Sequence, residues 1–134
     1  MFITIKFPDG RQMLDTTPDL AAASGVSQDL IDAAIAEARR KVVSEECERR
    51  IFAVASRNAQ VNIGLAAGVI GAKAAEARSA EEAATLAGAE AGLAWVMEMR
   101  AAFAALVADP DADYLADAAW PAPLAEVLAV LEQF

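Results

Sequence analysis

The chain has 134 residues and a formal net charge of −9, and 57% of its residues are hydrophobic although only 6% are aromatic. Nucleic acids are bound through clustered lysine and arginine, so this acidic chain is expected to have no nucleic-acid partner. The length suits one domain. Alanine makes up most of the hydrophobic excess, and it promotes helices while burying little area per residue. The composition therefore predicts close helix packing, often against other subunits.

The first 26 residues predict a β-hairpin and a short helix. Ile3, Ile5 and Phe7 alternate with other residues at the period of a strand, and the segment 8–10, Pro-Asp-Gly, has the composition of a turn. A second short strand follows, and a helix is expected over 18–24. An isolated two-stranded hairpin is marginal in water, so this segment is predicted to dock on the helices or on another chain.

From Ser27 to about Arg78 the sequence has no proline and predicts one long helix, far longer than the average of about 11–12 residues. Hydrophobic positions recur there at four-then-three spacing, the pattern of a coiled-coil seam, with Asn58 as its one polar member. This seam is the candidate oligomer or helix-packing interface. Its members are Cys47, Ile51, Val54, Asn58, Val61, Leu65 and Gly68.

Two interpretations of the seam stay open, because it can face a second copy of the chain or only the downstream helix. Gly64, Gly68 and Gly71 mark either a close approach or a break in the helix, and Gly64→Leu is expected to overpack a close contact. The longest apolar run, Ile63 to Ala72, has about 10 residues, whereas a membrane-spanning helix needs about 20. No membrane span is expected.

The remainder predicts two more helices. Ser79 and Glu82 form a capping box that starts a helix running to Ala108, and an acidic loop then leads to a final helix over 124–134. The expected fold is mainly α: a short N-terminal β-hairpin, a long helix, an antiparallel second helix and a short C-terminal helix in an oligomeric bundle. The expected divisions are a docking element at 1–26, a helical hairpin at 27–109, and an acidic loop with the last helix at 110–134.

The residue types argue against catalysis. The chain contains no histidine, the commonest general base and metal ligand, so we expect no enzyme and no cofactor. Asp109, Asp111 and Asp113 alternate as at the start of a calcium loop, but Tyr114 and Trp120 occupy the positions that need glycine and glutamate. No metal site is expected. The single cysteine is expected to be structural, and no secretory signal opens the sequence.

Several motifs together resemble small tail-associated proteins of bacteriophages and prophages. They are an Arg-Arg-Ile helix, a second helix with Trp followed by Met-Arg, and a Trp-Pro near the end of the chain. The matching residues are Arg49, Arg50, Ile51, Asn58, Trp95, Met99, Arg100, Trp120 and Pro121. The resemblance implies a structural component of a phage tail, in the tail fibre or baseplate region, located in the virion and assembled in the host cytoplasm.

The resemblance also implies partners. It favours a homo-oligomer, a trimer above all, that contacts other phage tail proteins. The alternative is a tail-fibre assembly chaperone that is not retained in the mature virion. A small-molecule binding protein is a third class, which would need a concave pocket with convergent polar groups. Apolar residues near the two ends are the candidate partner-docking positions: Phe2, Ile3, Ile5, Phe7, Trp120, Leu124, Leu128, Leu131 and Phe134.

Overall fold

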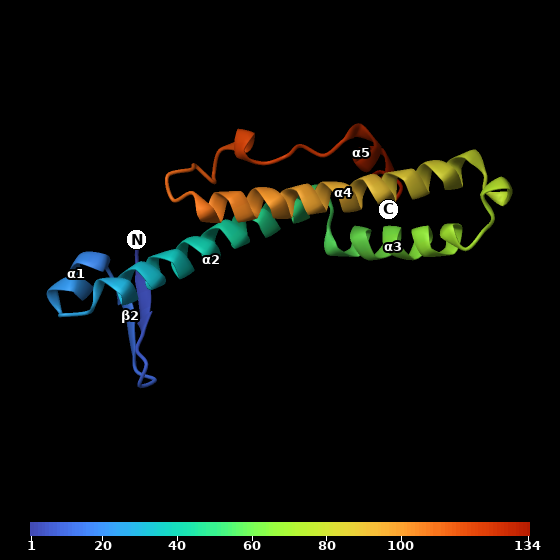
Figure 1. The fold of residues 1–134 in the computed structure, drawn as a ribbon. Helices are drawn as coiled ribbons and strands as arrows, with labels where there is room; N and C mark the ends of the chain where they lie inside the picture. The colour runs from blue at the N-terminus through green and yellow to red at the C-terminus, as the bar shows by residue number, and fades with distance from the viewer.

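A computed structural model describes all residues, 1–134, and has the predicted architecture of an N-terminal hairpin followed by helices (Figure 1). The molecule is elongated, with the β-hairpin near one end; α2 and then α3 extend from it, and α4 lies along both (Figure 1). Two single turns of 3₁₀ helix lie at Ala75–Ala77 and Asp117–Ala119. The main elements are β1 (Ile3–Lys6), β2 (Gln12–Thr16), α1 (Pro18–Ala23), α2 (Gln28–Val54), α3 (Arg57–Gly71), α4 (Ala80–Ala108) and α5 (Ala125–Leu131).

The predicted hairpin is confirmed, and it packs on the first half of α2. Strands β1 and β2 are antiparallel, with Ile5 opposite Met13 and a bulge on the β2 side. Gly10 takes a φ of +87° in the turn, a conformation that glycine adopts without steric cost. Ile3 and Ile5 form a small core with residues of α1 and α2. The hairpin is therefore supported by its own chain, as its marginal stability requires.

The expected single helix from Ser27 to Arg78 is wrong, because it is interrupted at Ala55 and Ser56. Ala55 has an extended backbone, and the Ser56 hydroxyl accepts a hydrogen bond from the Ala59 amide at 3.1 Å, which caps the start of α3. The side-chain amide of Gln60 donates from Nε2 to the Ala55 carbonyl at 2.8 Å. The break thus satisfies backbone groups that a helix end leaves free. The glycines do not cause this break, and Gly71 is the last residue of α3.

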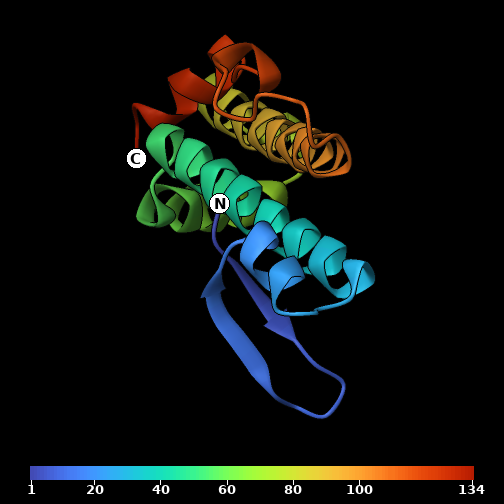
Figure 2. The ribbon, with the colours of Figure 1, turned by 90° about the vertical axis from the view of Figure 1, so that its left-hand side faces the viewer.

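Helix α4 returns along both α2 and α3 (Figure 1). The helices thus form an antiparallel hairpin, with α2 and α3 as one arm and α4 as the other. The capping box of α4 is confirmed, since Ser79 and Glu82 exchange both hydrogen bonds. The C-terminal segment then runs back along α4 and ends in α5. Viewed from the N-terminal end, the β-hairpin and α4 lie on different sides of α2 (Figure 2). The main core lies between α2, α4 and the C-terminal loop, and its buried members are Val43, Cys47, Trp95, Met99, Leu106 and Trp120.

Candidate interaction surface

The C-terminal loop is fastened to the helices by two indoles and an arginine. Trp95 donates its Nε1–H to the Pro121 carbonyl at 2.9 Å, and Trp120 donates to the Tyr114 carbonyl at 2.8 Å. Arg50 lies over the Trp120 ring, 5.7 Å from its centroid, and donates to the Leu115 carbonyl at 2.9 Å. Residues from three distant parts of the sequence thereby hold the loop against α2 and α4.

Arg50 also belongs to an ionic cluster, in which Arg50 and Glu46 are largely buried and Arg49 and Asp117 are exposed. Arg50 donates from Nε to Glu46 at 2.6 Å and from Nη1 to Asp117 at 2.9 Å, and its side chain is only 15% exposed. Arg49 forms two more hydrogen bonds to Glu46. Hydrogen bonds from Arg49 and then Arg50 outweigh the effect of burial and lower the pKa of Glu46 from 4.5 to about 2. This carboxylate is a structural anion that remains charged, so it has no role in proton transfer near neutral pH.

Arg39 makes a second long-range contact, which the sequence does not reveal. Its guanidinium donates to the carbonyls of Leu106 at 2.9 Å, Asp109 at 3.0 Å and Ala112 at 2.8 Å. It also lies 5.0 Å from the centroid of the Tyr114 ring. The first two carbonyls are at the C-terminal end of α4, where a cation stabilises both the unpaired acceptors and the negative end of the helix dipole, and the third is in the loop that follows. Arg39 therefore fixes the point where the chain leaves α4 and turns back.

The predicted seam is divided between two surfaces. Cys47 is buried, with its Sγ 3.8 Å from the Met99 carbonyl, and burial raises the pKa of its thiol, as in an inert structural cysteine. Ile51 and Val54 pack against the same core, within this chain. The members beyond the break are all exposed: Asn58, Val61, Leu65 and Gly68. A single continuous seam is therefore wrong, because the break changes the helical phase between the two halves.

The second half of the seam lies on what we call the outward face of α3, made of the polar Asn58 and of Val61, Gly64, Leu65, Gly68 and Val69. The face points away from α4, and no element of the chain covers it (Figure 1). Its three large side chains are 55%, 66% and 68% exposed in chain order. Covering each of these side chains would stabilise the protein by about 1–2 kcal/mol.

The expected close contact at Gly64 is not made within this chain. A Cβ built on Gly64 or Gly68 would have no atom within 4 Å. Each glycine still lowers the stability of its helix by up to about 1 kcal/mol relative to alanine. No packing contact inside the chain therefore accounts for these two glycines.

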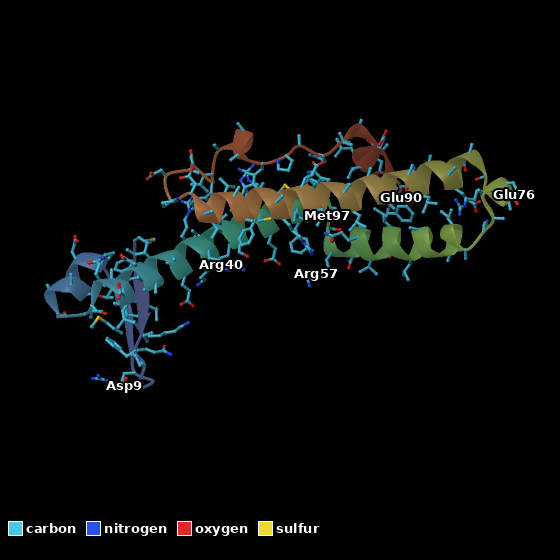
Figure 3. The ribbon with its side chains drawn as sticks, viewed as in Figure 1. Asp9, Arg40, Arg57, Glu76, Glu90 and Met97 are labelled. Carbon is cyan, nitrogen blue, oxygen red and sulfur yellow. The ribbon has the colours of Figure 1, made fainter.

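An open groove of about 520 Å³ lies beside this face, between α3, α4 and α5. Its walls are mostly apolar and include the small residues Gly64 and Ala67, while Gln60, Glu90 and Arg100 are its polar members. Figure 3 shows Glu90 on α4 beside α3, with Met97 further along the helix and Arg57 at the start of α3. A small-molecule site needs several convergent polar groups in a concave pocket. This groove is better suited to the apolar side chains of another protein segment.

The predicted docking residues are only partly accessible. Phe2, Leu124, Leu128 and Phe134 are exposed, whereas Phe7 and Leu131 are half-buried. Ile3 and Ile5 lie in the small core under the hairpin, and Trp120 lies in the main core. These three are not available to a partner, because α1, α2 and the Arg50 cluster cover them. Sequence reasoning missed Leu93 and Met97 of α4, which are 65% and 62% exposed; their spacing of four residues is the only signal for them.

The total exposed area is large for the mass of the chain. The structure exposes 8600 Å². A compact monomeric protein of 14.0 kDa exposes about 6700 Å², so this chain exposes roughly 1900 Å² more. Stable protein–protein interfaces bury about 1200–2000 Å² in total, and obligate ones bury more. The excess is thus of the size that assembly with other chains would remove.

Two further features bear on the alternatives. Helix α4 is long and apolar enough to cross a membrane by length and composition, and it also contributes Trp95 and Met99 to the core described above. No group of three or more His, Cys, Asp or Glu side chains is arranged to hold a metal ion. Asp109 and Asp113 instead accept hydrogen bonds from backbone amides two residues further on.

No family model matches the chain, and no curated protein matches it.

Proposed function

We propose that this chain is a non-enzymatic assembly protein that acts by packing its uncovered apolar surface against other protein chains. The observation that carries the proposal is the exposed area of 8600 Å² in a 14.0 kDa chain, together with the uncovered apolar side chains of α3 and the open groove beside it. Burial of such surface is the main favourable term in most protein association. The proposed partners are copies of this chain and other proteins of the same assembly.

The assembly that we propose is a phage tail, in its fibre or baseplate region. This part of the proposal is supported by the resemblance of the Arg-Arg-Ile, Met-Arg and Trp-Pro motifs. Four of those residues, Arg50, Trp95, Trp120 and Pro121, meet in one cluster that fastens the C-terminal loop.

The second candidate is an assembly chaperone, which the open apolar groove favours. A groove of about 520 Å³ flanked by small residues suits the transient binding of an apolar segment from an unassembled partner. Mass spectrometry of purified tail particles separates the two candidates. A structural component is expected in the particle at a fixed ratio to the other tail proteins. A chaperone is expected in complexes from infected cells and absent from the particle, and absence from both would contradict the phage-tail proposal.

A further inference from the structure

We infer that the outward face of α3 is the contact between copies of this chain, where it packs on the same face of a second copy. The inference rests on the proposed function, because it takes assembly as given and names the surface and the partner. The other exposed apolar positions, at the hairpin and along α5, are left for other proteins of the assembly.

Charge selects this face for a contact between identical chains. Each copy carries a net charge of −9, so most pairs of surfaces repel each other. The sequence from Arg49 to Ala75 contains no aspartate or glutamate, and it is the longest such stretch in the chain. Within α3 itself, Arg57 is the only charged residue. The α3 segment is therefore the place where two acidic copies can approach with the least repulsion.

The shape of the outward face also favours a second copy of the chain as its partner. Val61, Leu65 and Val69 are spaced four residues apart and form a ridge along the helix, and Gly64 and Gly68 leave a flat track beside it. A contact between identical surfaces must be complementary to itself, with a projecting row and a hollow row on the same patch. When two copies meet, the ridge of each α3 can lie on the glycine track of the other. The glycines then permit the close approach that this chain alone does not use.

The excess exposed area of the chain also agrees with the size of a dimer interface. The chain exposes roughly 1900 Å² more than a compact protein of its mass. Two copies that each buried half of this excess would form an interface within the range of stable dimers, about 1200–2000 Å² in total. The outward face borders the neighbouring groove at Gly64, which belongs to both. The remaining excess leaves room for a further partner.

Cysteine crosslinking tests which face meets the second copy. Leu65→Cys places a thiol on the outward face, and Leu20→Cys places one on α1 at nearly the same exposure, since the two leucines are 66% and 60% exposed. Cys47 is buried and stays in both variants. With a short bismaleimide crosslinker, Leu65→Cys is expected to give a covalent dimer and Leu20→Cys only monomer. Equal crosslinking of both variants, or none at position 65, would overturn the inference.

Substitution of Gly64 tests the contact without disturbing the fold. A Cβ at position 64 would meet nothing within 4 Å inside the chain, so Gly64→Leu should keep the helix content and should not lower the melting temperature of the chain at low concentration. The dissociation constant of the oligomer should rise at least about tenfold, because the added side chain occupies the glycine track. Ala36→Leu, at an exposed position of α2, is the matched control and should leave the constant unchanged.

The outcomes separate the inference from the proposed function. If the wild-type chain is an oligomer that neither Gly64→Leu nor crosslinking at position 65 affects, the α3 contact is refuted and assembly through another face stands. If the wild-type chain is a monomer at every concentration, the contact between copies is refuted as well. In that case assembly with a different protein is tested by the particle composition alone.

Discussion

Gly88 offers the most direct test of how the C-terminal helix is held. It lies on the buried side of α4, where α5 crosses. A Cβ at this position would lie 2.7 Å from the Val130 Cβ and 3.1 Å from the Glu126 carbonyl oxygen. Neither atom is the free end of a flexible side chain, so α5 must move to accept Gly88→Ala. Gly92, one turn further along α4, is the matched control, because its Cβ would meet only Val127 Cγ1 at an ordinary 3.9 Å.

The expected change in the free energy of unfolding of Gly88→Ala follows from two opposing effects. Alanine raises the stability of a helix by up to about 1 kcal/mol relative to glycine. Overpacking costs about 1–3 kcal/mol, and full displacement of α5 would expose Val127 and Val130, at about 1.5–3 kcal/mol each. Both valines are 3% exposed in the structure. Gly88→Ala should therefore lower the free energy of unfolding by up to about 2 kcal/mol, whereas Gly92→Ala should raise it by about 0.5–1 kcal/mol.

Urea unfolding of the two variants and the wild type measures these free energies, and limited proteolysis of the segment after Trp120 reports whether α5 has moved. Gly88→Ala should be cleaved faster in that segment, and Gly92→Ala should be cleaved at the wild-type rate. If both substitutions stabilise the protein equally, α5 does not cross α4 at Gly88 and the packing described above is incorrect.

Three further predictions concern charges and a helix cap. The pKa of Glu46 is lowered from 4.5 to about 2 in the folded chain, so its contribution of about 3 kcal/mol is complete above pH 4.5 and is lost as the pH falls towards 2. Stability measured against pH should flatten over this range in Glu46→Gln, and an unchanged profile would contradict the assignment. Arg50→Lys should lower the free energy of unfolding by about 2 kcal/mol, because lysine cannot keep all the charged hydrogen bonds. Arg49→Lys is the control and should cost less, because the Arg49 side chain is 61% exposed. Equal losses in the two variants would argue against the Arg50 cluster. Ser79→Ala should cost about 1 kcal/mol by removing the cap of α4, as thermal unfolding can measure, and no loss would mean that the cap is not formed.

Local patterns in the sequence predicted most of the elements. The alternation in β1, the Pro-Asp-Gly turn and the Ser79 capping box each depend on residues within a few positions of one another. The break at Ala55 and Ser56 was missed because no proline or glycine marks it and the hydrophobic spacing continues across it. The only local signal is Ser56 itself, a favoured cap residue. The three downstream glycines are stronger helix-breaking signals, so the alternative of a break was placed at them instead. Because the helix is broken there, the two halves of the predicted seam face different directions.

The surface was predicted less well than the fold. Whether Ile3 is free or buried depends on the hairpin packing on α2, and the carbonyls that Arg39 and Arg50 bind lie 65–73 residues away in the sequence. One sequence carries no signal for pairs so far apart. The exposure of Val61 and Leu65 is likewise a property of the whole fold, because it depends on which side of α3 the returning helix α4 covers.

The measurement that tests the central claim most directly is the mass of the untagged chain in solution, by light scattering after size exclusion over a range of concentrations. Packing of copies through their uncovered apolar surface predicts a discrete mass of at least twice 14.0 kDa that dissociates on dilution. A mass of 14.0 kDa at every concentration would contradict self-assembly, and would mean that the exposed area is covered by a different protein or not at all.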